Sequence, residues 1–247
     1  MSTRSPLRWG SKVVKRIITS DTASCTGDIQ SMTGAHAARN VGQSHKIIAA
    51  ATHVFVRYGF KRVTMGEIAA AAGMSRAALY LVYPSKEDVL TAVVTQVFAA
   101  MLDEIHHGLG YCATAEEQLT FALDVWCVRG FELVQASPDA KDLYESGYRF
   151  AAEVMATATA DFVALVADVL DPLVRQQATV VLSSVQIAQV LASAVLGFKG
   201  SATTTEQLRT MIARLITIVL VSLDTPTAQP EGNQGDRMRI VGKAEAP

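Results

Sequence analysis

Hydrophobic residues recur every three or four positions along most of the chain between residues 44 and 224, which is the spacing of amphipathic helices. The first such helix ends at Gly59. Its apolar face consists of Ile47, Ile48, Ala51, Phe55 and Tyr58. No segment alternates between apolar and polar residues for long enough to predict a sheet. The pattern therefore predicts an all-α protein.

Two short helices joined by a tight turn are predicted next. Thr64 and Glu67 have the spacing of a capping box, in which each side chain accepts a hydrogen bond from the backbone amide of the other residue. This box begins a second helix that runs to about Ala72. Gly73 can adopt the left-handed conformation that ends a helix, and Ser75 is suited to cap a third one.

The window 64–83 has the spacing and residue types of a helix-turn-helix. Its expected inward positions are all apolar, namely Ile68, Ala72, Met74, Leu79 and Val82. Ala69 is small at the point where the two helices would cross most closely. A fourth helix follows Ser85, which can cap it, and continues past Met101. The motif indicates DNA binding.

The rest of the chain predicts a larger helical body. The expected helices cover 116–136, 139–157, 159–170, 176–198 and 205–223. The breaks between them fall at Ser137-Pro138, Asp171-Pro172 and Gly197–Gly200. We therefore expect an N-terminal domain of residues 44–90 followed by a second domain of residues 91–224.

The two ends of the chain lack sustained periodicity. Residues 1–43 have no apolar core of the kind a signal peptide needs, and they are predicted to form a flexible basic extension. Met32 could also initiate translation, which would make this extension an over-long gene start. Residues 225–247 are polar and are predicted to be a disordered tail.

The net charge of −1 conceals an asymmetry between the two ends of the protein. Residues 1–43 carry six Lys or Arg against two Asp or Glu, and residues 44–90 carry six against three. Residues 91–224 carry seven against fifteen. A basic N-terminal third joined to an acidic body indicates a front end that meets a polyanion.

Composition and motif content argue against several other classes. The cysteines are Cys25, Cys112 and Cys127. They are too few and too scattered for a disulfide framework or a paired-cysteine metal site, so a reducing cytoplasm is expected. His106 and His107 lie near Asp103, but adjacent histidines point to different helix faces. No phosphate-binding, dinucleotide-binding or nucleophile-elbow motif occurs, so no catalytic residue, metal or cofactor is predicted.

Residues 44–90 resemble the DNA-binding domain of the TetR (tetracycline repressor) family. The resemblance is carried by Ala50-Ala51, Phe55, Gly59-Phe60, Thr64, Ile68-Ala69, Ala72-Gly73-Met74-Ser75, Leu79-Tyr80 and Pro84-Ser85-Lys86-Glu87. It covers about a fifth of the chain, and outside it only the number, length and order of the helices are similar. The resemblance implies that the second and third helices form the DNA-reading unit and that the third enters the major groove.

The resemblance also implies roles for individual residues of this unit. Arg76 and Ala77 open the third helix beside the base edges, where Arg76 can donate two hydrogen bonds to a guanine and Ala77 can touch a thymine methyl group. Three further residues match family positions that contact the phosphate backbone, namely Tyr80, Lys86 and Thr64. The alternative for Tyr80 and Lys86 is that they are ordinary surface residues.

The third helix departs from the family pattern at two positions. Leu81 and Val82 stand where family members often have an aromatic residue and a histidine, so the operator sequence does not follow from the resemblance. Leu81 is expected to make apolar contacts with bases or sugars. The predicted DNA-contact set is Thr64, Ser75, Arg76, Ala77, Tyr80, Leu81 and Lys86.

For the body, the resemblance implies effector binding and dimerisation. The segments 176–198 and 205–223 are expected to pair with their counterparts in a homodimer. Aromatic residues concentrated in the body either line an effector pocket or are plain core. The pocket candidates are Phe121, Trp126, Phe131, Tyr144, Tyr148 and Phe162.

We therefore predict a dimeric, cytoplasmic repressor that a small apolar or aromatic effector releases from a pseudo-palindromic DNA operator. One alternative is a cytosolic helical small-molecule-binding protein or enzyme with an incidental helix-turn-helix. Another is a membrane-associated protein anchored by 176–198, which has no charge between Arg175 and Lys199. The glutamines and serines of that segment favour a dimer interface over lipid. Activation in place of repression stays open.

Overall fold

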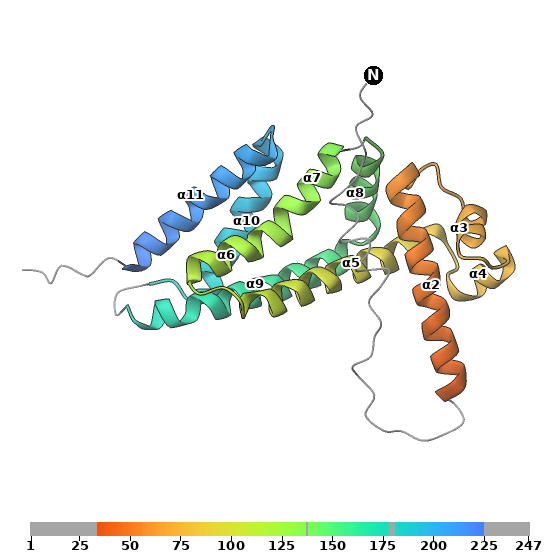
Figure 1. Cartoon of the computed structure of the whole chain (residues 1–247), viewed down its shortest axis with the longest axis horizontal. Helices are drawn as coiled ribbons and strands as arrows, with labels where there is room; N and C mark the ends of the chain where they lie inside the picture. Colours follow the sequence, from red (N-terminus) through yellow and green to blue (C-terminus); the bar gives the residue numbers. More distant parts are fainter. Residues whose placement is uncertain (1–33, 137, 178–180, 225–247) are drawn as a thin grey trace, which may run out of the picture.

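The computed structural model describes residues 34–136, 138–177 and 181–224, and these residues contain helices and no strand. The helices are α2 (Gly34–Tyr58), α3 (Met65–Ala71), α4 (Arg76–Val82), α5 (Lys86–Leu109), α6 (Ala115–Leu123), the π-helix η1 (Asp124–Val128), α7 (Arg129–Ala136), α8 (Pro138–Phe150), α9 (Ala152–Arg175), α10 (Ser184–Ser201) and α11 (Thr205–Asp224). Figure 1 shows an elongated molecule with α3 and α4 at one end and α10 and α11 towards the other. The prediction of an all-α fold is confirmed.

The first apolar core lies between α2, α3, α4 and the start of α5. Phe55, Ile68, Leu79 and Leu90 are fully buried in it, and each such side chain stabilises the fold by about 1.5–3 kcal/mol relative to exposure. Of the predicted inward positions, Ile68, Leu79 and Ala72 are buried, whereas Met74 and Val82 are half-buried.

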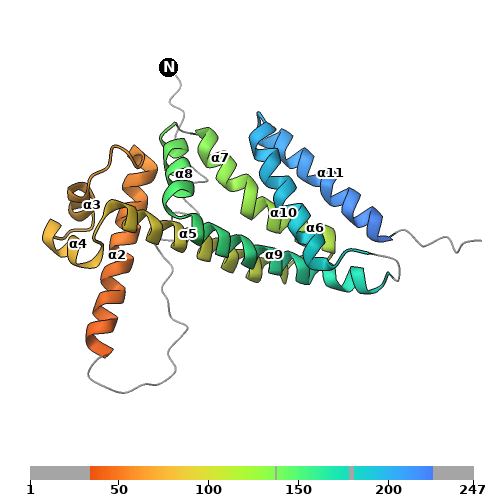
Figure 2. The same cartoon turned by 180° about the vertical axis from the view of Figure 1, so that it is seen from behind.

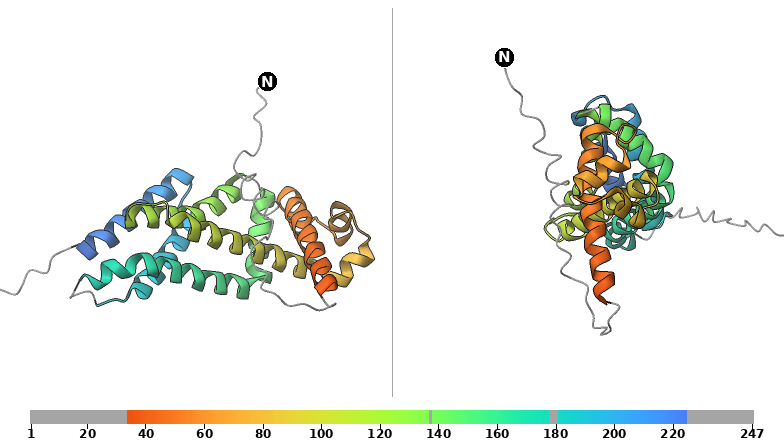
Figure 3. Two further views of the ribbon diagram at one scale, coloured as in Figure 1. Left: turned by 60° about the horizontal axis from the view of Figure 1, so that its bottom comes forward. Right: turned by 90° about the vertical axis from the view of Figure 1, so that its right-hand side faces the viewer.

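The second core joins α5, α6, η1, α7, α9, α10 and α11 around Phe162 and several fully buried leucines. α5 runs from the first core into the second, and α9 lies beside it along most of its length (Figures 2 and 3). A single long helix therefore connects the helix-turn-helix end of the molecule to the body.

Several predicted helix boundaries are wrong. α2 begins at Gly34 rather than after residue 43, and the remaining predicted extension and the predicted tail lie outside the described residues. The helix predicted over 139–157 ends at Phe150, and α9 leaves it at an angle of 89°. α9 also continues through Pro172, which has no amide hydrogen to donate to the carbonyl four residues before it, so the helix lacks one backbone hydrogen bond there.

The segment 176–198 is not one helix. Gln176 caps the end of α9, and Ser183 caps the start of α10 in a second capping box with Gln186. The span 116–136 is helical throughout but passes through the π-turn η1. The helix predicted over 205–223 is present as α11.

α8 holds the helix-turn-helix end to the body. The backbone amide of Lys61 donates to Oδ2 of Asp142 at 2.9 Å, and its ammonium lies 3.0 Å from Oδ1. Burial alone would raise the pKa of Asp142, but the hydrogen bonds from Lys61 outweigh it and leave that pKa lowered. Beside this pair, the ring centres of Phe60 and Phe150 lie 5.4 Å apart. The loop before α3 is thereby attached directly to α8.

Candidate nucleic-acid interface and ligand cavity

The turn between α3 and α4 is built from the local signals of the sequence. The Thr64 hydroxyl accepts from the Glu67 amide at 3.3 Å, and the Glu67 carboxylate accepts from the Thr64 amide at 2.7 Å, which confirms the capping box. Gly73 has φ = +62°, a left-handed conformation that L side chains rarely adopt. The Ser75 hydroxyl then accepts from the amide of Ala78 and begins α4.

α4 presents its predicted base-reading residues to solvent. Arg76, Ala77, Tyr80 and Leu81 are all exposed, and the side chain of Leu81 reaches 89% exposure. Arg76 Nη2 donates to the Tyr80 hydroxyl at 3.2 Å, and its guanidinium lies 5.5 Å from the centre of the Tyr80 ring. This contact holds the arginine along the exposed face of the helix.

A basic residue that the sequence reasoning missed lies next to the turn. The exposed Lys46 comes from α2, and its ammonium lies 3.6 Å from where a Cβ on Gly73 would stand. Only the packing of α2 against α3 brings these two residues together, so sequence spacing gave no signal. Lys46 thereby adds positive charge beside the reading unit.

Lys86 has a structural role besides its predicted phosphate contact. Its ammonium donates to the backbone carbonyls of Phe60 at 2.8 Å and Val63 at 2.9 Å. It also lies 4.3 Å from the centre of the Phe60 ring. An ammonium has three donors, so a third hydrogen bond can still go to a phosphate. Lys86 therefore fixes the loop that precedes α3.

Lys86→Met is expected to lower the free energy of unfolding by about 1.5–3 kcal/mol, because two half-buried carbonyls lose a charged donor. Urea denaturation measures this. Lys141→Met is the matched control, because Lys141 makes an exposed ion pair 3.9 Å from Glu145 within α8 and should change stability by less than about 1 kcal/mol. Equal unfolding midpoints for the two variants would contradict the structural role.

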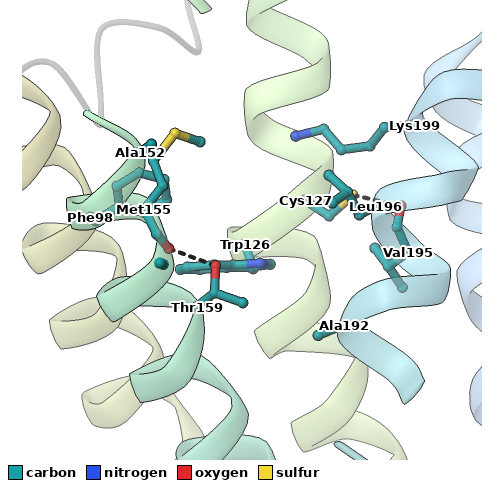
Figure 4. A pocket seen from close by; sticks show the side chains of 11 residues that line it. Phe98, Trp126, Cys127, Ala152, Met155, Thr159, Ala192, Val195, Leu196 and Lys199 are labelled. Atoms are coloured by element: carbon teal, nitrogen blue, oxygen red, sulfur yellow. Dashed lines mark hydrogen bonds between the residues drawn. The ribbon is translucent and has the colours of Figure 1, made fainter. Parts of the chain in front are cut away.

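A cavity of about 320 Å³ lies in the body between α5, η1, α9 and α10 (Figure 4). This volume is at the small end of the range of small-molecule sites. The cavity begins at the first turn of α9, directly after α8. Its lining consists of Phe98, Trp126, Cys127, Ala152, Met155, Ala156, Thr159, Ala192, Val195, Leu196 and Lys199.

Among the predicted pocket aromatics, Trp126 lines the cavity. Phe162 lies directly behind Trp126, stacked on it with ring centres 4.4 Å apart and planes 5° apart. Phe131 is buried in the core, and Phe121 packs against the core beside Gly108. Tyr144 and Tyr148 lie on α8, and their side chains are outside the described part of the structure.

Trp126 and Cys127, which both line the cavity, lie in the π-turn η1. Burial raises the pKa of the Cys127 thiol to about 11, although the nearby ammonium of Lys199 acts in the opposite direction. The thiol is therefore neutral at physiological pH and donates to the carbonyl of Val195 at 3.7 Å. It is a polar lining group rather than a nucleophile.

Within 34–136, 138–177 and 181–224, no group of three or more His, Cys, Asp or Glu is placed to hold a metal ion. In the same residues, α5 is long and apolar enough to cross a membrane, and the bent pair of α8 and α9 passes that test only when joined. α5 packs against α2, α6, α8 and α9 as part of the fold.

Residues 47–93 match the family described as bacterial regulatory proteins, tetR family. An uncharacterised HTH-type transcriptional regulator of Mycobacterium bovis is 38% identical over 60 residues, which are 24% of this chain and 32% of the relative. The match thus spans about a third of the length of that relative.

Solved structures share the whole architecture. A transcriptional regulator from Cytophaga hutchinsonii is 22% identical, with a TM-score of 0.61 over 73% of this chain and 98% of the other. The TetR-family repressor FadR of Thermus thermophilus, solved with lauroyl-CoA, is 23% identical, with a TM-score of 0.51 over 76% of this chain and 97% of the FadR chain.

The fold and the matched segment combine an N-terminal helix-turn-helix, of the kind found in DNA-binding transcriptional regulators, with a helical C-terminal domain. More specifically, residues 47–93 are the part of the chain that is similar to the tetR family of bacterial regulatory proteins.

Proposed function

We propose that this protein is a dimeric, non-enzymatic cytoplasmic repressor that a small apolar effector releases from a pseudo-palindromic operator. The observation that carries DNA reading is the exposed face of α4, where Arg76, Ala77, Tyr80 and Leu81 stand clear of the fold. Thr64, Ser75, Lys86 and the neighbouring Lys46 are the proposed phosphate contacts around it. The two reading helices of a dimer would engage half-sites about 34–36 Å apart or a multiple of that distance.

Selection of bound duplexes from a random DNA pool tests the proposal. Purified full-length protein at physiological salt is expected to enrich a pseudo-palindrome. Ala77→Glu supplies a matched control, because it places a carboxylate on the exposed reading face without touching the core. If folded wild-type protein enriches no sequence, the proposal fails and the molecule is better described as a small-molecule-binding protein.

Arg76→Ala is expected to cost about 1–3 kcal/mol of DNA-binding free energy at one base pair and to relax the preference there. The reason is that a bidentate arginine–guanine contact is lost. Binding to a set of operators with single base changes measures the effect. Tyr80→Phe, which keeps the ring beside Arg76 but removes the hydroxyl that it contacts, should lose a smaller part of the preference. An equal loss of affinity for every sequence would assign Arg76 to phosphate contact instead.

The position of the cavity supports its use as an effector site. Its α9 wall begins where α8 ends, and α8 is attached to the loop before α3 through the Lys61–Asp142 pair. A ligand that moves the start of α9 would therefore displace α8 and, with it, the helix-turn-helix. A coupling free energy of about 1–3 kcal/mol is typical of such linked sites. The lauroyl-CoA bound by the Thermus relative supports an effector with an apolar part.

The proposed dimer interface is formed by α10 and α11, at the end of the molecule away from α4 (Figure 1). Val190, Leu196 and Ile218 are more than half exposed on these helices. A Cβ added to Gly197 or Gly200 would meet nothing within 4 Å, so the packing of the chain itself requires neither glycine. Small residues beside exposed apolar ones suit the close approach of a second helix pair.

A further inference from the structure

The cavity is apolar over most of its surface but has one charged wall. Among its described lining residues, Lys199 is the only one with a formal charge. Its side chain extends from α10 across the cavity towards α7 (Figure 4). Its ammonium lies 3.6 Å from where a Cβ on Gly130 would stand. An ammonium and a large aromatic surface, Trp126, therefore border the same space.

The surroundings favour an anion beside this ammonium. The lining contains no carboxylate, and the Cys127 thiol is neutral. Asp124 and Glu132 accept hydrogen bonds from Arg209 at 3.1 and 3.0 Å. The three donors of an ammonium allow Lys199 to accommodate a ligand oxygen in addition to contacts within the protein.

We propose that the cavity binds a monocarboxylate with an apolar body, its carboxylate paired with Lys199 and its body lying on Trp126 between Phe98 and Met155. Charge-assisted hydrogen bonds are roughly twice as strong as neutral ones, so the acid gains more from Lys199 than an alcohol of the same length. An amine would meet a like charge. This inference rests on the proposed role of the cavity as the effector site and adds the chemical class of the effector.

Fluorescence of Trp126 tests the proposal without DNA. The chain has two tryptophans, so Trp9→Phe leaves Trp126 as the only emitter. Octanoate, 1-octanol and octylamine are titrated into this full-length variant. Octanoate is expected to bind at least about tenfold more tightly than octanol, and octylamine is expected to bind most weakly. Octanol binding as tightly as octanoate, or no binding of any probe to folded protein, would overturn the proposal.

Variants at Lys199 separate charge recognition from general apolar binding. Lys199→Met should reduce the affinity for octanoate to that for octanol, and the affinity for octanol should stay the same or increase. Lys199→Arg should keep the preference for octanoate over octanol. Lys141→Met removes the same charge from an exposed site on α8 and should change neither affinity. Equal effects of Lys199→Met and Lys141→Met would overturn the proposal.

The DNA selection and the octanoate titration test the two proposals separately, so either proposal can fail while the other holds. Octanoate binding through Lys199 by a protein that enriches no duplex would contradict the proposed repressor function and leave the carboxylate site standing. Enrichment of an operator by a protein that prefers octanol would support DNA binding and contradict the carboxylate site.

Discussion

Phe162→Ala is expected to lower the free energy of unfolding by about 3–5 kcal/mol. Phe162 is fully buried in α9, and its ring stacks on Trp126 with centres 4.4 Å apart. Truncation removes this stack and opens a void next to the cavity, and the surrounding helices can close that void only in part. Urea denaturation monitored by circular dichroism measures the loss.

Phe162→Leu distinguishes the loss of buried volume from the loss of the aromatic stack on Trp126. Leucine keeps much of the buried apolar volume, so its cost is expected to be clearly smaller than that of alanine. If both variants unfold at the same urea concentration as the wild type, the tight packing behind Trp126 does not contribute to stability. Near-equal large losses would exceed the contribution of the aromatic stack, which is about 0.5–1.5 kcal/mol beyond area burial, and would show that leucine does not fill the space behind Trp126.

The helix-turn-helix could be predicted closely because its determinants are local. The Thr64–Glu67 box, the left-handed Gly73 and the Ser75 cap each involve residues within a few positions of one another, and all are present. The same reasoning would have found the Ser183–Gln186 box that begins α10. The absence of charge around that box favours one continuous helix over 176–198, and this is why the predicted start of the helix is wrong.

The cavity could not be predicted in the same way because its walls come from distant parts of the chain. Periodicity identifies an apolar position but does not distinguish one that faces a cavity from one that faces a neighbouring side chain. Phe162 and Trp126 are therefore equivalent in sequence, although only Trp126 lines the cavity. In the sequence Lys199 only marks the end of an uncharged segment, and the approach of α10 to α7 places it in the site.

Ile218→Glu is expected to convert the proposed dimer to a monomer. Ile218 is 66% exposed on α11, so a glutamate there costs the isolated chain little. In a symmetric interface each substitution occurs twice, and two carboxylates would be desolvated together. Sedimentation velocity measures the change. Ala99→Glu, at an exposed position on α5, is the matched control and should leave the dimer intact.

Ile218→Glu should also lose more than about a hundredfold in affinity for the full operator, while its thermal stability should be unchanged. A dimer presents its second reading helix to the second half-site at a high effective concentration, and a monomer loses that advantage without losing any contact of its own. Affinity for an isolated half-site should consequently be unchanged. A variant that stays dimeric would place the interface elsewhere, whereas a monomer with undiminished operator affinity would show that one reading helix is sufficient.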